Sequence, residues 1–205
     1  LLPTAFDLYP DFLKTRTNEI KTKEDAQQAF RGKIKFCNFL YSNHMAHPNR
    51  DRLFYILSSY KRVDSLGKHL NNVKQRGTGY VGHESACVEI KNPYKFSIAA
   101  ENAQFEGYTT EKLLTSLAAH TIPIYFGDPE IEKIVNPKCF INCNKLNKLE
   151  DVLEIVNRID SNDNLWLEMV ASPWQTEEQV ILSEKRKANY YCFFKVLFNQ
   201  PLDKA

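Results

Sequence analysis

The chain has 205 residues, 43% of them hydrophobic and 25% charged, so it can form one domain with a substantial core. Its 27 Lys and Arg residues nearly balance its 25 Asp and Glu residues, which gives a net charge of +2. This balance argues against nucleic acid or an anionic membrane as the main partner. The sequence also shows no signal peptide and no apolar run of about 18 residues that could span a bilayer. Because the net charge is small, any functional positive charge must be local.

Predicted strands and helices alternate along the chain. Residues 1–32 are polar, and we expect a loop and then a short helix there. Aromatic and aliphatic runs predict strands at 33–41, 62–67, 94–100, 122–126 and 139–142. Apolar residues at helical spacing predict helices at 50–60, 110–120, 151–159, 162–171 and 177–198. We expect Asn49 as the N-cap of the first helix and Thr109 or Thr110 as the N-cap of the second. The glycine-rich segment 74–82 is predicted as a loop. This order favours an α/β fold with a mostly parallel sheet flanked by helices.

Five cysteines, an odd number, are spread along the chain. Only Cys139 and Cys143 lie close together, and no second pair completes a zinc site. Because 139–142 is predicted as a strand, we expect both side chains on the same face of the sheet. We interpret the cysteines as reduced, apolar residues, which favours a cytoplasmic location.

The segment from Glu101 to Gly127 carries the functional signal. A buried strand ends in Glu101-Asn102, a loop follows, and the next helix begins with hydroxyls, a carboxylate and Lys112. In open α/β sheets, ligands bind where strand ends meet helix N-termini, and the N–H groups and dipole there favour phosphate. Lys112 adds a positive charge at that place, and Asn102 and Glu111 can hold hydroxyl groups of a sugar or ribose.

A nucleoside diphosphate leaving group needs its developing charge stabilised by a metal or by fixed cations. The metal route in nucleotide-sugar enzymes commonly uses an Asp-x-Asp pair, which this sequence lacks. Asp160 and Asp163 have a different spacing, and we interpret them as part of a helix start. The expected cations are therefore side chains: Lys112, together with Arg50 or Arg52 from an earlier helix.

Several residues in this segment follow a spaced pattern: Glu101-Asn102, Tyr108, Thr110-Glu111-Lys112, then Ile122-Pro-Ile and Gly127. The pattern resembles the signature of the α-1,3-fucosyltransferases of glycosyltransferase family 10. Upstream, the segments 35–43 and 63–68 and the residue Arg50 are similar to the bacterial members. The resemblance extends from about Lys33 to Trp174.

The resemblance implies a Rossmann-like domain that is the C-terminal half of a GT-B glycosyltransferase and binds GDP-fucose. It divides the chain into an N-terminal segment that is a remnant of, or a link to, an acceptor-side domain (1–32), the donor-binding domain (33–174) and a C-terminal helical segment (175–205). It places Lys112 and Arg50 at the diphosphate. The other implied donor-site residues are Glu101, Asn102, Tyr108, Thr110, Glu111 and Gly127.

The implied reaction is an inverting transfer of fucose from GDP-fucose to a hydroxyl of a glycan acceptor, such as one of the N-acetyllactosamine type. The family needs neither a metal nor another cofactor. Its carboxylate base lies in the N-terminal domain, and only 49 residues precede Arg50 here. We therefore expect the base outside this chain.

Four alternatives remain open. The chain could use another nucleotide sugar, or it could be a non-catalytic module that binds nucleotide or glycan. Glu111 and Lys112 could simply be a favourable charge and a solvated lysine at a helix start. The charged run at 184–187 is interpreted as a solvated helix face, with a weak peripheral contact to the inner face of a membrane as the alternative.

Overall fold

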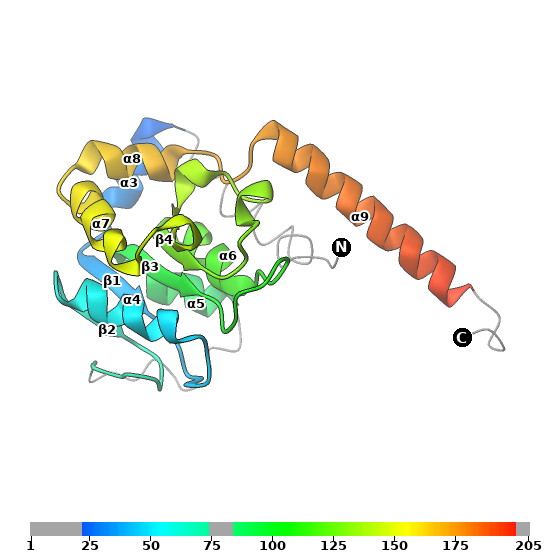
Figure 1. Cartoon of the computed structure of the whole chain (residues 1–205). Helices are drawn as coiled ribbons and strands as arrows, with labels where there is room; N and C mark the ends of the chain where they lie inside the picture. The colour runs from blue at the N-terminus through cyan, green and yellow to red at the C-terminus, as the bar shows by residue number, and fades with distance from the viewer. Residues whose placement is uncertain (1–21, 74–83, 200–205) are drawn as a thin grey trace.

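Five parallel strands lie at the centre of the computed structural model, which describes residues 22–73 and 84–199 (Figure 1). The strands follow the order β2-β1-β3-β4-β5 across the sheet. Their bounds are β1 (Lys35–Phe39), β2 (Val63–Ser65), β3 (Tyr94–Ala100), β4 (Ile122–Phe126) and β5 (Ile141–Asn142). Every neighbouring pair is parallel, which confirms the predicted α/β fold. The loop predicted at 74–82 lies outside the described residues.

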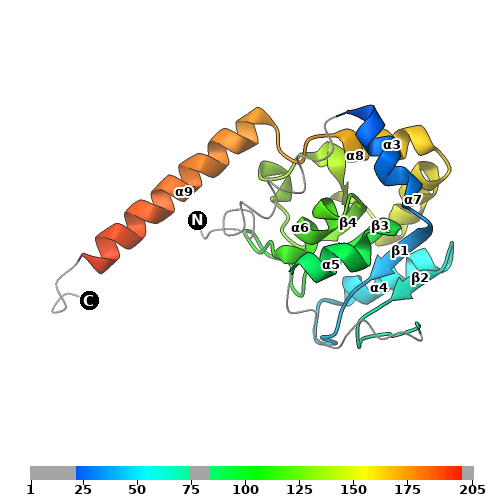
Figure 2. The ribbon, with the colours of Figure 1, turned by 180° about the vertical axis from the view of Figure 1, so that it is seen from behind.

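Helices cover both faces of the sheet. On the face seen in Figure 1 lie α4 (Pro48–Ser58), α7 (Val152–Asp160) and α8 (Asp163–Ala171), and Figure 2 shows α5 (Glu84–Lys91) and α6 (Glu111–Ala118) on the other face. The helix α3 (Lys23–Arg31) packs against α8, with the rings of Phe30 and Trp166 5.1 Å apart. This layering buries both faces of the central strand, as parallel sheets require.

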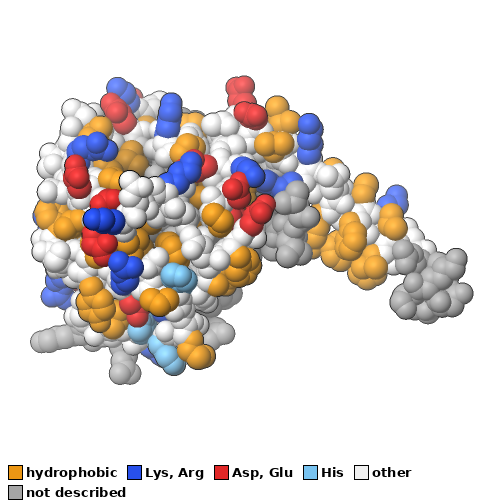
Figure 3. Space-filling view, viewed as in Figure 1, with side chains coloured by type: hydrophobic (Ala, Val, Ile, Leu, Met, Phe, Trp, Pro, Cys, Tyr) orange, Lys and Arg blue, Asp and Glu red, His pale blue; other side chains and the backbone are white. Residues whose placement is uncertain are grey.

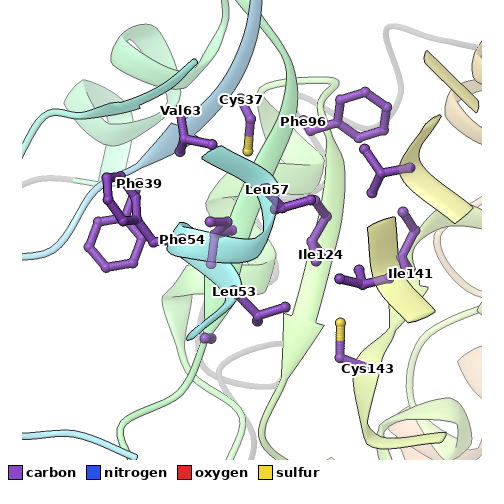
Figure 4. Packing of buried hydrophobic residues seen from close by; sticks show 14 of the residues in the cluster. Cys37, Phe39, Leu53, Phe54, Leu57, Val63, Phe96, Ile124, Ile141 and Cys143 are labelled. Carbon is purple, nitrogen blue, oxygen red and sulfur yellow. The ribbon is translucent and has the colours of Figure 1, made fainter. Parts of the chain in front are cut away.

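Apolar side chains form one core on each face. On the α4 side, Leu57 packs beside Ile124 of β4, and Cys143 lies at the edge of the same cluster (Figure 4). On the α6 side, Leu113 and Leu117 pack with Tyr125. The sheet is therefore held rigidly between two helical layers, and the ends of its strands are fixed.

The two neighbouring cysteines lie in different cores, so the expectation that they share a face is wrong. Cys139 belongs to the cluster on the α6 side and Cys143 to the cluster on the α4 side. The reason is that β5 spans only Ile141–Asn142, so that both cysteines fall in 3₁₀ turns on either side of it. Burial raises the pKa of the Cys139 thiol to about 12, and all five cysteines are free.

One predicted helix start needs correction, and one helix was missed. The helix α4 begins at Pro48, and its N-cap is His47, whose Nδ1 accepts a hydrogen bond from the backbone N–H of Asn49. Proline at the first helical position fixes the helical φ and explains the earlier start. The helix α5 was not predicted, because Val88 is its only fully buried hydrophobic residue and its sequence has no apolar stripe.

The helix α9 (Glu177–Phe198) extends away from the three-layered domain (Figures 1 and 2). Hydrophobic side chains lie along its exposed surface (Figure 3), among them Ile181, Tyr191, Phe193, Val196 and Phe198. No helix in the part of the chain that the structure describes is long and apolar enough to cross a membrane.

Gly67 generates a prediction, because the loop after β2 passes directly against Tyr41. An added Cβ at Gly67 would lie 1.9 Å from the carbonyl oxygen of Tyr41. We therefore expect Gly67→Ala to lower the free energy of unfolding by at least about 1–3 kcal/mol in urea denaturation. Gly32→Ala is the matched control, since its Cβ would meet its nearest neighbour at 3.5 Å. Equal stability of the two variants would contradict the close packing at Gly67.

Candidate functional site

The carboxyl ends of β1, β3 and β4 meet at one edge of the sheet, and the candidate site lies there. The backbone N–H of Glu101, directly after β3, donates to the carbonyl of Phe126 at the end of β4 (2.7 Å). The hydroxyl of Tyr41, after β1, donates to the Ile98 carbonyl (2.9 Å) and accepts from the Ala100 N–H (2.7 Å). These bonds fix where the loops leave the sheet.

Glu101 is the buried centre of the site, with none of its surface exposed. Its carboxylate accepts hydrogen bonds from the backbone N–H (2.8 Å) and hydroxyl (2.7 Å) of Thr110, and from Lys112 Nζ (3.1 Å). Thr110 occupies the N-cap position of α6, but its side chain makes no capping bond there: the hydroxyl donates to Glu101 and accepts from Lys112 Nζ instead. Glu101 therefore ties the start of α6 to the end of β3.

Lys112 carries the positive charge of the site. Its Nζ lies 2.8 Å from Thr110 Oγ1 and 3.4 Å from Glu111 Oε1, and its side chain is 18% exposed. Burial alone would lower the pKa of Lys112, but the charges of Glu101 and Glu111 raise it above its ordinary value. The same contact with Lys112 lowers the pKa of Glu111, although burial opposes this. The ammonium group is thus firmly charged at neutral pH.

Arg50 lies behind Asn102. Its guanidinium donates to Asn102 Oδ1 (3.3 Å) and to the carbonyl of Asn43 (2.7 Å), and it stacks 4.7 Å above the Tyr41 ring. Only 1% of its side chain is exposed. The competing candidate Arg52 points elsewhere: it is 52% exposed and forms an ion pair with Glu150 (2.7 Å). The structure therefore brings Arg50, and not Arg52, to Asn102.

Tyr108 and Gly107 belong to the loop that joins β3 to α6. The Tyr108 ring stacks on the exposed ring of Phe105, with centroids 4.7 Å apart. Gly107 has a φ of 80°, a left-handed conformation that glycine adopts without strain. The loop thus presents two aromatic rings on the surface beside the Glu101–Lys112 cluster.

Gly127 is required by packing inside the protein. A Cβ at Gly127 would lie 2.5 Å from Glu101 Cγ and 2.9 Å from the Tyr125 hydroxyl. Its N–H donates to Asn144 Oδ1 (3.1 Å), and Asn144 also donates to the Asp128 carbonyl (3.1 Å). Sequence analysis missed Asn144 and Asp128, because no local pattern marks a residue that acts through a distant loop.

A cavity of about 400 Å³ opens beside these loops. It lies between the start of α4 and the ends of β4 and β5, and its lining includes Asn49, Arg52, Gln104, Phe126, Asn144 and Glu150. The His47 N–H donates to the Asn102 carbonyl (2.7 Å), and the His47 ring packs on Phe126, with centroids 4.8 Å apart. The cavity is thus continuous with the Asn102 loop and is rich in amide groups that can bind hydroxyls or a base.

Carboxylates elsewhere are used in ion pairs. Asp160 and Asp163 both contact Lys95, at 3.3 and 3.6 Å. Within residues 22–73 and 84–199, no group of three or more His, Cys, Asp or Glu side chains is placed to hold a metal ion.

Comparison with known proteins identifies the family. Residues 30–198 match the model described as "Glycosyltransferase family 10 (fucosyltransferase) C-term". The chain belongs to this family. A mimivirus (Acanthamoeba polyphaga mimivirus) protein named as a fucosyltransferase is 33% identical over 175 residues, which cover 83% of this chain and 29% of that protein. The Helicobacter pylori alpha-(1,3)-fucosyltransferase FucT is 32% identical over 139 residues, 66% of this chain and 27% of that enzyme.

Other relatives carry a different name. The GDP-fucose protein O-fucosyltransferase 3 of Xenopus laevis is 33% identical over 129 residues, which cover 60% of this chain and 28% of that protein. The chain therefore spans less than a third of the length of these three relatives.

A solved structure supports the same assignment. A crystal structure of an alpha1,3-fucosyltransferase with GDP-fucose superposes with a TM-score of 0.70 and 27% identity, over 86% of this chain and 51% of that chain. A second crystal structure, of an alpha1,3-fucosyltransferase with GDP, has a TM-score of 0.73 at 23% identity and covers 98% of this chain and 66% of that chain. The family and these structures confirm the predicted Rossmann-like, GT-B type fold.

Loss of Lys112 should change how the stability of this fucosyltransferase-family domain depends on pH. Burial raises the pKa of Glu101 above its ordinary 4.5, and Lys112 limits the rise. A raised folded-state pKa means that stability falls as pH increases from about 4.5 through that pKa. In Lys112→Met the pKa of Glu101 should rise further. The decrease in the free energy of unfolding between pH 5 and pH 7 should then grow by about 1.4 kcal/mol for each added pKa unit.

The control is the double variant Glu101→Gln/Lys112→Met, in which the neutral amide removes this titration. Urea denaturation at the two pH values measures both variants. A fall of the same size in the single and the double variant would contradict the assignment to Glu101.

Proposed function

We propose that this chain supplies the GDP-fucose site of an inverting, metal-independent fucosyltransferase that acts on a glycan hydroxyl. The observation that carries the proposal is the Glu101–Thr110–Lys112 cluster at the start of α6, which holds a charged ammonium group at the strand ends of a Rossmann-like sheet. Phosphate binding at such a helix start is favoured by the helix dipole and by the added cation. The names of relatives that use GDP-fucose support the choice of donor.

In the proposed reaction an acceptor hydroxyl oxygen attacks the anomeric carbon of fucose while the bond to the β-phosphate oxygen breaks. Attack from the face opposite the leaving group inverts the anomeric centre. The hydroxyl proton passes to a carboxylate base, which we place in the part of the relatives that this chain does not match. The electron pair of the broken bond remains on GDP.

Lys112 has the main role in this scheme. Its fixed ammonium charge stabilises the diphosphate as negative charge develops on it, without a metal ion. Arg50 contributes a second fixed charge from behind Asn102 and keeps that amide oriented by its 3.3 Å hydrogen bond. Glu111, 45% exposed at the same helix start, and the Tyr108 loop are proposed to contact the ribose or the fucose.

Two kinds of acceptor are candidates for the proposed transfer. The family signature favours a glycan such as one of the N-acetyllactosamine type. A second candidate, transfer to a protein hydroxyl, is favoured by the relatives named GDP-fucose protein O-fucosyltransferase 3. Both candidates share the donor site, so tests of donor binding apply to each.

Donor binding by this chain is the first test. Isothermal titration calorimetry with GDP, GDP-fucose and UDP, in the presence and absence of EDTA, should show binding of both guanine nucleotides that EDTA leaves unchanged. UDP should bind more weakly, because only the guanine nucleotides match the proposed donor. Absence of binding at millimolar GDP, or binding abolished by EDTA, would contradict the proposal.

Removal of the central cation is the second test. Lys112→Ala should weaken GDP binding by about 10- to 100-fold, since one hydrogen bond between charged groups contributes about 1.5–3 kcal/mol. Lys138→Ala is the matched control. Lys138 is exposed and lies before the amino end of β5, whereas the candidate site lies at the carboxyl ends of the parallel strands. Thermal unfolding shows whether each variant is folded. Equal GDP affinity of a folded Lys112→Ala and the control would remove Lys112 from the site.

A further inference from the structure

A second lysine lies buried directly beneath the helix that carries Lys112. Lys91 is the last residue of α5 and only 4% exposed. Its Nζ donates to the Lys112 carbonyl (3.2 Å), the Thr115 hydroxyl (2.8 Å) and the Ser116 hydroxyl (2.9 Å). An ammonium group has three donors, so these three bonds to α6 use all of its hydrogen-bonding capacity.

Hydrogen bonds connect Ser116, one of the Lys91 partners, to the sheet. Ser116 Oγ lies 3.0 Å from Ser97 Oγ on β3, and Ser97 Oγ donates to Asn38 Oδ1 on β1 (3.0 Å). Asn38 in turn donates to the Phe96 carbonyl (3.1 Å). Three of these polar residues, Asn38, Ser97 and Ser116, are fully buried. This line of hydrogen-bonded polar residues therefore fixes the position of α6 relative to β1 and β3, whose ends contribute to the candidate site.

Comparison with the other buried lysine shows that Lys91 is unusual. Lys33 donates to the carbonyls of Asn92 and Ala119, which directly follow the ends of α5 and α6. A cation is favourable at helix C-termini, so the helix dipoles account for Lys33. Lys91 also lies at a helix C-terminus, as the last residue of α5, but its ammonium group is directed at the side of α6 and donates to Lys112, Thr115 and Ser116 there. The facing carboxylates of Glu111 and Glu101 offset part of its charge, and its three hydrogen bonds to α6 indicate a positional role.

We infer that Lys91 is a positioning residue of the nucleotide site: it fixes the first turns of α6 and adds a buried positive charge behind Lys112, so that a diphosphate binds more tightly. This inference rests on the proposed function. Lys91 does not touch the ligand, because its Nζ is enclosed by α6. Its effect passes through the Lys112 backbone and through electrostatic attraction across the buried interior, where charges are weakly screened.

The pH dependence of binding follows from the surroundings of Lys91. Burial lowers its pKa to about 8, and the facing charged or titratable groups are Cys87 on α5, Glu111 and Lys112 on α6, and Glu101 after β3. Burial raises the pKa of Cys87, and the pKa of Lys112 is also raised, so neither loses a proton before Lys91 does. Wild-type affinity for GDP should fall about 3- to 10-fold between pH 7 and pH 9 as Lys91 becomes neutral.

The test compares Lys91→Met with Lys33→Met, a matched variant of the other buried lysine. Calorimetry at constant ionic strength gives the GDP dissociation constant at pH 7 and pH 9, and urea denaturation gives stability. We expect Lys91→Met to bind GDP about 10-fold more weakly than the wild type at pH 7. Its GDP affinity should then change little between pH 7 and pH 9. Lys33→Met should keep the wild-type affinity and pH profile even where its stability decreases.

Thr115→Val serves as a milder variant if Lys91→Met does not fold. It removes one of the three acceptors, so the affinity should decrease less and the pH midpoint should move to a lower value. Wild-type affinity in folded Lys91→Met or Thr115→Val, or an unchanged pH profile in either, would overturn the role of Lys91. Failure of the wild-type chain to bind GDP at any pH would instead overturn the proposed function itself.

Discussion

The site depends on one buried carboxylate. Glu101 is out of contact with water at the end of the central strand, and an ionised carboxylate there is costly unless it is paired and hydrogen-bonded. Thr110 and Lys112 meet this requirement together, and in doing so they fix the first turn of α6 against the sheet. A side chain that would otherwise be a mobile surface lysine thus becomes a fixed charge beside the helix N-terminus.

Other features of the edge follow from the same constraint. Gly127 leaves room for the Glu101 side chain, and Asn144 holds the Gly127 backbone in place. Arg50 and His47 fix Asn102, the next residue along the chain, from the side of α4. The cavity lies beside this fixed backbone, and its amide-rich lining comes from the loops that the interactions hold. Pre-organisation of this kind reduces the free energy lost on ordering a site when a ligand binds.

The sequence predicted the strands and the Glu101–Lys112 segment because both depend on local signals, apolar runs and a helix start. It did not predict α5, since that helix buries Val88 and a lysine rather than an apolar stripe. It also gave no indication that the Arg50 side chain is buried, because the partners of Arg50, at Asn43 and Asn102, come from two other loops. The polar line through Asn38, Ser97 and Ser116 joins residues 19 to 59 positions apart, which no sequence spacing can show.

Amide chemical shifts in the ¹⁵N-labelled chain test the central claim, that the diphosphate binds at the start of α6. The chain is titrated with GDP and, in parallel, with guanosine, which lacks the phosphates. The account predicts that the shifts specific to GDP concentrate at Thr110, Glu111 and Lys112. Shifts of equal size with guanosine, or GDP-specific shifts that leave this turn unchanged, would contradict it.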